Sequence, residues 1–238
     1  MSDQEHHPEH SGEAITIMKI QPAYETGVIV TSEVQETDGR LPDRYTGYFD
    51  NISPPLHWNS VPDVRAWAVI VEDPDAPQTH PFVHWMVWNI HGEVTSLPEG
   101  LPNQEFLATP QGGIQGRNGM GGYGYFGPRP PAGHGVHRYY FQVFALADTI
   151  DMGPDTPLPD LVNALKGLTL AKGELMATYE APESAESDFH YRSEGKGGGK
   201  SQAGGALEED PAGSTVIRGE KASPGDRKRG EISSSDQT

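Results

Sequence analysis

Four residues along the chain have side chains that can bind a small polar ligand: Asp73, His84, His137 and Tyr139. Asp73 begins the run Asp73-Pro74-Asp75-Ala76-Pro77, in which two prolines restrict the backbone and hold two carboxylates close together. An imidazole donates or accepts a hydrogen bond near neutral pH, and a tyrosine hydroxyl does both. Side chains of these types, brought together, predict a pocket for a small anion such as a phosphorylated headgroup.

The elements that must position these side chains are mostly β-strands, because short β-rich runs alternate with Pro and Gly along the chain. The composition of each run predicts its structure. Clear strands are expected at residues 66–72, 83–90 and 137–146, weaker ones at 15–20 and 27–34, and a further short one at 45–48. One helix is expected from Pro159 to Gly167, and residues 168–179 fit either a strand or a second short helix. The pattern predicts an all-β fold with one or two short helices.

Side-chain alternation along two of these strands places each histidine on a packed face. In the second clear strand, His84 is expected to share its face with Met86, Trp88 and Ile90. In the third, the same alternation groups His137 with Tyr139, Phe141 and Val143. A histidine on an otherwise apolar face needs a hydrogen-bonding partner.

Each of these features also has an ordinary structural explanation. The Asp-Pro run is a common kind of turn, and a single buried histidine is more often a hydrogen-bonded core residue than a ligand-binding one. Two histidines and an acid fixed by prolines favour a site when they occur together.

A glycine-rich segment, residues 112–127, lies between the second and third clear strands and ends in Gly127-Pro128-Arg129-Pro130-Pro131. Such a segment either lies against a ligand or is simply a long mobile loop. It contains G-x-G-x-x-G at Gly119, Gly121 and Gly124, but a proline-rich turn follows where a dinucleotide-binding motif needs a helix. The dinucleotide interpretation therefore carries little weight, and the segment is expected to support the pocket, with Arg129 and Arg138 offsetting the local acid.

The composition limits the classes of function. The chain has a net charge of -17 and no cysteine, which argues against nucleic-acid binding and excludes disulfides and thiolate catalysis. No stretch approaches the apolar length of a membrane span, so a cytoplasmic protein without a transmembrane segment is expected.

The chain divides into three parts by composition. Residues 15–182 read as one globular domain, whereas residues 1–14 and 183–238 are polar and are expected to be disordered. The C-terminal part holds Gly, Ser and charged residues with almost no large apolar side chains.

Three separated motifs resemble the phosphatidylethanolamine-binding protein (PEBP) family, in its bacterial Raf-kinase-inhibitor-like (YbhB/YbcL type) branch. They are Asp73-Pro74-Asp75-Ala76-Pro77, His84-Trp85 with Val87 and Asn89, and Gly127-Pro128-Arg129-Pro130-Pro131 leading to His137-Arg138-Tyr139. The resemblance covers roughly Ile15 to Tyr179. It implies an antiparallel Greek-key β-sandwich, and a ligand pocket at Asp73, His84, His137 and Tyr139 with Asp75 and Tyr125 beside it.

The resulting hypothesis is a non-enzymatic binding protein without cofactors. Both imidazoles and the Tyr139 hydroxyl are expected to donate hydrogen bonds to phosphate, sulfate or carboxylate oxygens, while Asp73 orients a histidine or binds a ligand amine such as that of phosphoethanolamine.

Two alternatives remain open. The same His and Asp residues fit a metal-dependent or acid-base hydrolase, although no nucleophile is tied to the motifs. The resemblance also implies regulation of a kinase or protease partner and is compatible with a homodimer.

Overall fold

The structure is a computed structural model that describes residues 13–108 and 112–182. In chain order the elements are η1 (Thr16–Lys19), β1 (Val30–Thr31), η2 (Asp43–Tyr45), β2 (Leu56–Trp58), β3 (Ala66–Asp73), β4 (Phe82–His91), β5 (Ser96–Leu97), β6 (Ile114–Gln115), β7 (Val136–Leu146), α1 (Leu158–Leu168) and β8 (Thr169–Glu180). The strands form an antiparallel three-stranded sheet, β1-β2-β5, and an antiparallel five-stranded sheet, β6-β4-β3-β7-β8. The all-β fold with a short helix, expected from the sequence, is confirmed.

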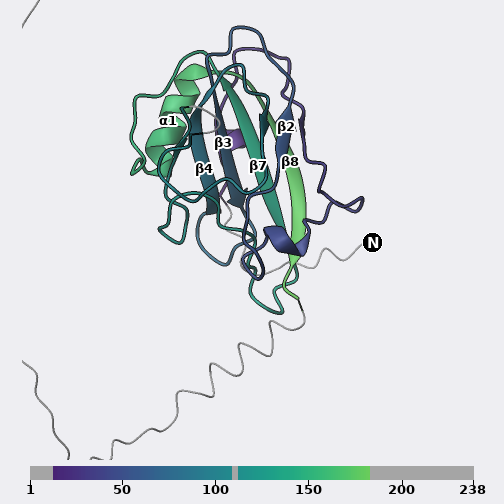
Figure 1. Cartoon of the computed structure of the whole chain (residues 1–238). Coiled ribbons are helices and arrows are strands. Elements are labelled where there is room, and N and C mark those ends of the chain that lie inside the picture. Colours follow the sequence, from purple (N-terminus) through teal and green to yellow (C-terminus); the bar gives the residue numbers. More distant parts are fainter. Residues whose placement is uncertain (1–12, 109–111, 183–238) are drawn as a thin grey trace, which may run out of the picture. The chain divides into compact units, whose positions relative to one another are not determined.

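The central strand β3 is buried along its whole length because both faces of the large sheet are covered. Trp67 and Val69 project into a core shared with the small sheet, to which β2 contributes Leu56. Ala68 and Ile70 project into a second core closed by η1 and α1. The domain therefore has two sheets packed face to face and a helical layer behind the larger one; Figure 1 shows α1 beside β4 and β3, away from β2.

Most of the expected elements are present, with boundaries shifted by a residue or two. The three clear strands correspond to β3, β4 and β7, the helix to α1, and residues 168–179 to a strand, β8. The weaker run at 27–34 is reduced to β1, and β2, β5 and β6 are too short to be recognised from composition.

Two expected strands are wrong. Residues 15–20 contain the 3-10 helix η1, because the backbone N–H groups of Thr16 and Ile17 donate to buried side chains, Glu72 and Gln142, rather than to a neighbouring strand. Residues 45–48 begin with the last residue of another 3-10 turn, η2, and continue as a bend and turn in place of a strand.

The expected face of His84 is also wrong, because β4 does not alternate regularly. The register between β3 and β4 shifts between Val71, which pairs with Trp85, and Glu72, which pairs with Val83. His84 is the extra residue of this β-bulge. A bulge turns its side chain toward the face of its neighbour, here the Trp85 face, and away from Met86.

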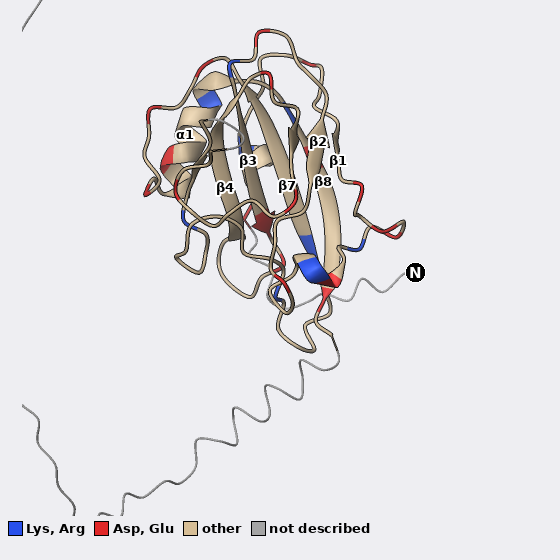
Figure 2. Ribbon diagram, viewed as in Figure 1, with Lys and Arg blue, Asp and Glu red and all other residues tan. Residues whose placement is uncertain are grey.

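The charge distribution does not single out one surface. Acidic residues are spread over loops on several sides of the domain (Figure 2). Apart from residues 13 and 14, the termini expected to be disordered, 1–14 and 183–238, lie outside the described residues.

Candidate functional site

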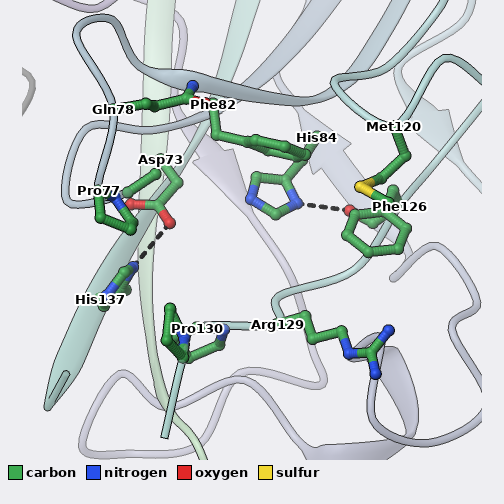
Figure 3. Close-up of a pocket in the computed structure, with 12 residues that line it drawn as sticks. Asp73, Pro77, Gln78, Phe82, His84, Met120, Phe126, Arg129, Pro130 and His137 are labelled. Carbon is green, nitrogen blue, oxygen red and sulfur yellow. Dashed lines mark hydrogen bonds and ion pairs between the residues drawn. The ribbon is translucent and has the colours of Figure 1, made fainter. Parts of the chain in front are cut away.

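A cavity of about 270 Å³ opens at the end of β3 where Asp73 closes the strand. Its polar wall contains Asp73, His84 and His137 (Figure 3). The two histidines come from β4 and β7, the strands on either side of β3. Three of the four principal predicted residues therefore line one cavity, brought there by neighbouring strands.

Asp73 and His137 form a buried pair. His137 Nδ1 lies 2.8 Å from Asp73 Oδ2, and both side chains are almost fully buried. The other carboxylate oxygen, Oδ1, accepts a hydrogen bond from the backbone N–H of Asp75 at 2.7 Å. Because an ionised carboxylate only accepts, it holds the hydrogen of His137 on Nδ1 and leaves Nε2 for a ligand.

Asp75 is not on the cavity wall and serves a different purpose. Its carboxylate accepts hydrogen bonds from Arg138 Nε at 2.8 Å, Nη2 at 2.6 Å and the Arg138 backbone N–H at 2.9 Å. This two-pronged contact with Asp75 raises the pKa of the Arg138 guanidinium further above its usual value. It fixes the first residues of β7, and hence His137, against the Asp-Pro turn.

His84 reaches the cavity through the β-bulge and is held by the glycine-rich segment. Its Nδ1 lies 2.6 Å from the carbonyl oxygen of Phe126, and its ring lies nearly parallel to the Phe126 ring, with an interplanar angle of 11°. Burial lowers the pKa of His84 to about 4. At neutral pH the ring is therefore uncharged, and its one hydrogen, on Nδ1, is donated to the Phe126 carbonyl.

Tyr139 lies beneath the cavity, next to both histidines. Its ring meets that of His84 edge-on at 5.1 Å between centroids and stacks on that of His137 at 6.5 Å. Burial raises its pKa well above the usual value, so the hydroxyl keeps its proton. That hydroxyl is buried and has no hydrogen-bond partner within the described part of the chain.

Tyr125 does not line the cavity. Its hydroxyl donates to the backbone oxygen of Tyr45 at 2.8 Å, and its ring packs edge-on against Trp85. The sequence could not distinguish this core tyrosine from one that faces a ligand.

Only part of the segment Gly127–Pro131, which was expected to support the pocket, lines the cavity. Arg129, Pro130 and Pro131 line the cavity. Gly127 and Pro128 lie behind it: the Pro128 carbonyl accepts from the backbone N–H of Gly47 at 2.9 Å. The guanidinium of Arg129 points away from Asp73 and His137 (Figure 3) and lies over the ring of Tyr48, 5.6 Å from its centroid.

The apolar part of the wall was not predicted from the sequence. It contains Phe82, Phe126 and Met120, and Ala76 and Pro77 of the Asp-Pro run lie beside them with Gln78. Met120 is 65% exposed at the rim. Phe82 is the first residue of β4 and lies two residues before His84, a spacing that places both side chains on the same face of a strand. A strand predicted to begin at residue 82 in place of 83 would have identified it.

The described part of the chain contains neither a metal-binding cluster nor a membrane-spanning helix. In residues 13–108 and 112–182 no group of three or more His, Cys, Asp or Glu side chains is placed to hold a metal ion. No helix in these ranges is long and apolar enough to span a membrane.

The fold and the cavity define a ligand-binding β-sandwich protein with a small histidine-containing pocket. The family model for phosphatidylethanolamine-binding protein matches residues 31–180. The chain therefore belongs to the phosphatidylethanolamine-binding protein family.

Relatives and solved structures place it in the YbcL-like branch. The chain is 44% identical over 141 residues to the UPF0098 protein PH1269 of Pyrococcus horikoshii, covering 59% of this chain and 70% of that protein. It is 42% identical over 142 residues to a UPF0098 protein of Methanothermobacter thermautotrophicus, covering 59% and 91%. The crystal structure of Escherichia coli YbcL, described as a member of the mammalian PEBP family, matches with a TM-score of 0.60 and 32% identity, covering 66% of this chain and all (100%) of YbcL.

Proposed function

We propose that this protein binds a small phosphorylated headgroup in the cavity between Asp73, His84 and His137. The observation that carries the proposal is the buried Asp73–His137 pair, whose 2.8 Å contact leaves one imidazole nitrogen directed to the ligand. A carboxylate that fixes a histidine in this way is a common support for a binding side chain.

The polar groups at the cavity suit a ligand with both charges. His137 donates from Nε2 when its ring is protonated. Asp73 and His84 are acceptors. A phosphoethanolamine-type headgroup brings oxygens for the donor and an ammonium group for the two acceptors.

The dimensions and the walls support a headgroup rather than a large substrate. The cavity of about 270 Å³ lies just below the usual range of roughly 300–1,000 Å³ for small-molecule pockets. Phe82, Phe126 and Pro130 surround the polar groups with apolar surface, which excludes water and strengthens the hydrogen bonds to the ligand.

The test is calorimetric titration of phosphate and phosphoethanolamine into the full chain, stripped of metal. Saturable binding is expected for the wild type and its loss for His137→Ala. The matched control is His57→Ala, which removes an exposed histidine of β2 that pairs with Glu33 and does not line the cavity. No heat with either ligand in a folded wild type, or equal binding by His137→Ala, contradicts the proposal. Repeating the titration with added zinc tests the metal-dependent alternative.

The cytoplasmic location, the kinase or protease partner and the homodimer stay predictions from the sequence and its family resemblance.

A further inference from the structure

One peptide unit joins His84 to Asn51, a residue outside all the motifs. The carbonyl oxygen of Phe126 lies 2.6 Å from His84 Nδ1. The N–H of the same peptide, on Gly127, donates to Asn51 Oδ1 at 2.7 Å. Hydrogen bonds at the two ends of one peptide polarise and strengthen each other.

This arrangement determines which nitrogen of His84 carries the hydrogen. A carbonyl oxygen can only accept, so Nδ1 must be the donor. The other nitrogen, Nε2, faces the open space of the cavity on the side of Asp73 and His137 (Figure 3). Within the described residues Nε2 has no hydrogen bond of its own. Since burial lowers the pKa of His84 to about 4, Nε2 at neutral pH is an unprotonated acceptor.

Asn51 is suited to hold the peptide in place. Its φ of 57° lies in the left-handed region that asparagine and glycine tolerate best. Gly127 is held from the other side, because a Cβ there would lie 2.3 Å from the backbone oxygen of Tyr45. The peptide plane is therefore fixed at both edges, with Asn51 as its hydrogen-bond acceptor.

The wall around His84 contains a second acceptor. Asp73, at the end of β3, accepts hydrogen bonds when it is ionised. The other polar groups near the His84 ring are His137 and Tyr139 of β7. Arg129 also lines the cavity, but its guanidinium lies over the Tyr48 ring. A ligand oxygen that carries a proton can donate to Nε2 or to Asp73. A ligand oxygen without a proton faces the lone pair of Nε2 and cannot donate to it, so the buried nitrogen is left without a hydrogen bond.

We propose, building on the function proposed above, that Asn51 acts through the Phe126–Gly127 peptide to hold His84 as a hydrogen-bond acceptor, so that the pocket selects oxyanions that carry a proton over those that carry none. Inorganic phosphate belongs to the first class near neutral pH, because both of its forms there, the monoanion and the dianion, carry a proton. A phosphate monoester, whose second phosphate pKa is about 6, belongs to it only below that pH. Sulfate belongs to the second. The protein thereby distinguishes two anions of nearly equal size and shape.

The first test compares inorganic phosphate with sulfate by calorimetry at about pH 6.5 and constant ionic strength, using the full chain. Phosphate is expected to bind at least about tenfold more tightly, which corresponds to the loss of one hydrogen bond. Equal or tighter binding of sulfate overturns this inference and leaves the anion-binding function intact. Binding of neither ion overturns the proposed function itself.

The second test isolates Asn51 with two variants that both tolerate its backbone conformation. Asn51→Gly removes the acceptor, whereas Asn51→Asp keeps it. The ring nitrogen shifts of His84, measured by ¹⁵N NMR, are expected to report hydrogen on Nδ1 in the wild type and Asn51→Asp, and a mixture of tautomers in Asn51→Gly. The phosphate-to-sulfate affinity ratio should fall toward one only in Asn51→Gly.

Two outcomes of this second test contradict the proposal. One is an Asn51→Gly protein with unchanged ring shifts and unchanged selectivity. The other needs no variant: a wild-type His84 that carries its hydrogen on Nε2 at neutral pH overturns the inference even if Asn51→Gly does not fold.

Discussion

Asp73 and His137, which lie 64 residues apart in the chain, meet through a buried contact of 2.8 Å between Oδ2 and Nδ1. The contact is possible because β3 and β7 are antiparallel neighbours, so that the last residue of one strand lies beside the first residues of the other. One acid therefore fixes both the turn that follows it, through the backbone of Asp75, and the histidine across the sheet.

We expect Asp73→Asn to weaken both stability and binding. An amide oxygen can replace one of the two accepted hydrogen bonds but presents an NH₂ group toward the other partner. The expected loss in free energy of unfolding is about 1–3 kcal/mol, measured by urea denaturation, with phosphate affinity reduced by about tenfold. Asp148→Asn, which changes an exposed acid, is the control and should match the wild type. An Asp73→Asn protein with wild-type stability would show that the pair contributes little.

Asp75 is expected to matter more for stability than Arg138, although the two side chains bind each other. In Asp75→Asn the buried carboxylate becomes an amide, of which only the oxygen can accept from the Arg138 backbone N–H and guanidinium. The expected cost in free energy of unfolding is about 1–3 kcal/mol. Arg138→Lys keeps a cation and the backbone hydrogen bond. Because the arginine side chain is 47% exposed, solvent screens its ion pair and a smaller loss is expected. Urea denaturation of both variants decides the order, and a larger loss in Arg138→Lys contradicts it.

The large sheet and the identity of three wall residues could be predicted from the sequence. The strands β3, β4 and β7 are long and rich in β-branched and aromatic residues, and burial of both faces of β3 gives an unbroken apolar run. Asp73 and His137 stand at the ends of these strands, so their position near one edge of the sheet follows from the strands themselves.

The rest of the site depends on features that leave no local pattern. The bulge at His84 is a mismatch between two strands, and a single strand read alone shows only regular alternation. The hydroxyl of Tyr125 finds its acceptor on Tyr45, 80 residues earlier in the chain. Asn51 reaches Gly127 across 76 residues. Contacts of this kind are fixed by tertiary packing, which composition and periodicity do not contain.

Replacement of Gly127 by alanine is expected to distort the pocket from behind. The added Cβ would lie 2.3 Å from the backbone oxygen of Tyr45 and 2.8 Å from the Cα of Thr46, so the peptide that holds His84 must move. We expect a loss of about 1–3 kcal/mol in the free energy of unfolding and weaker phosphate binding.

The control for this substitution is Gly167→Ala in α1, where a new Cβ meets no atom within 4 Å. Alanine is the better helix former, so this variant should be as stable as the wild type or more stable by up to about 1 kcal/mol, with unchanged binding. Equal behaviour of the two alanine variants contradicts the close packing of Gly127.

His84 should make the folded protein sensitive to mild acid. Its pKa is lowered from 6.5 to about 4 by burial, so between these values the unfolded chain takes up a proton that the folded protein refuses. The free energy of unfolding therefore falls as the pH falls through this window, by about 3 kcal/mol from this group at pH 4, and is unaffected by it above about pH 7.

The measurement is urea denaturation at pH 7, 5.5 and 4 for the wild type and His84→Asn, whose amide can still donate to the Phe126 carbonyl. The difference between the two proteins should shift by this amount in favour of His84→Asn on acidification, whereas His57→Asn, at an exposed site, should follow the wild type. Parallel curves for wild type and His84→Asn would mean that His84 is protonated in the folded state, and would also remove the acceptor on which the selectivity for protonated oxyanions depends.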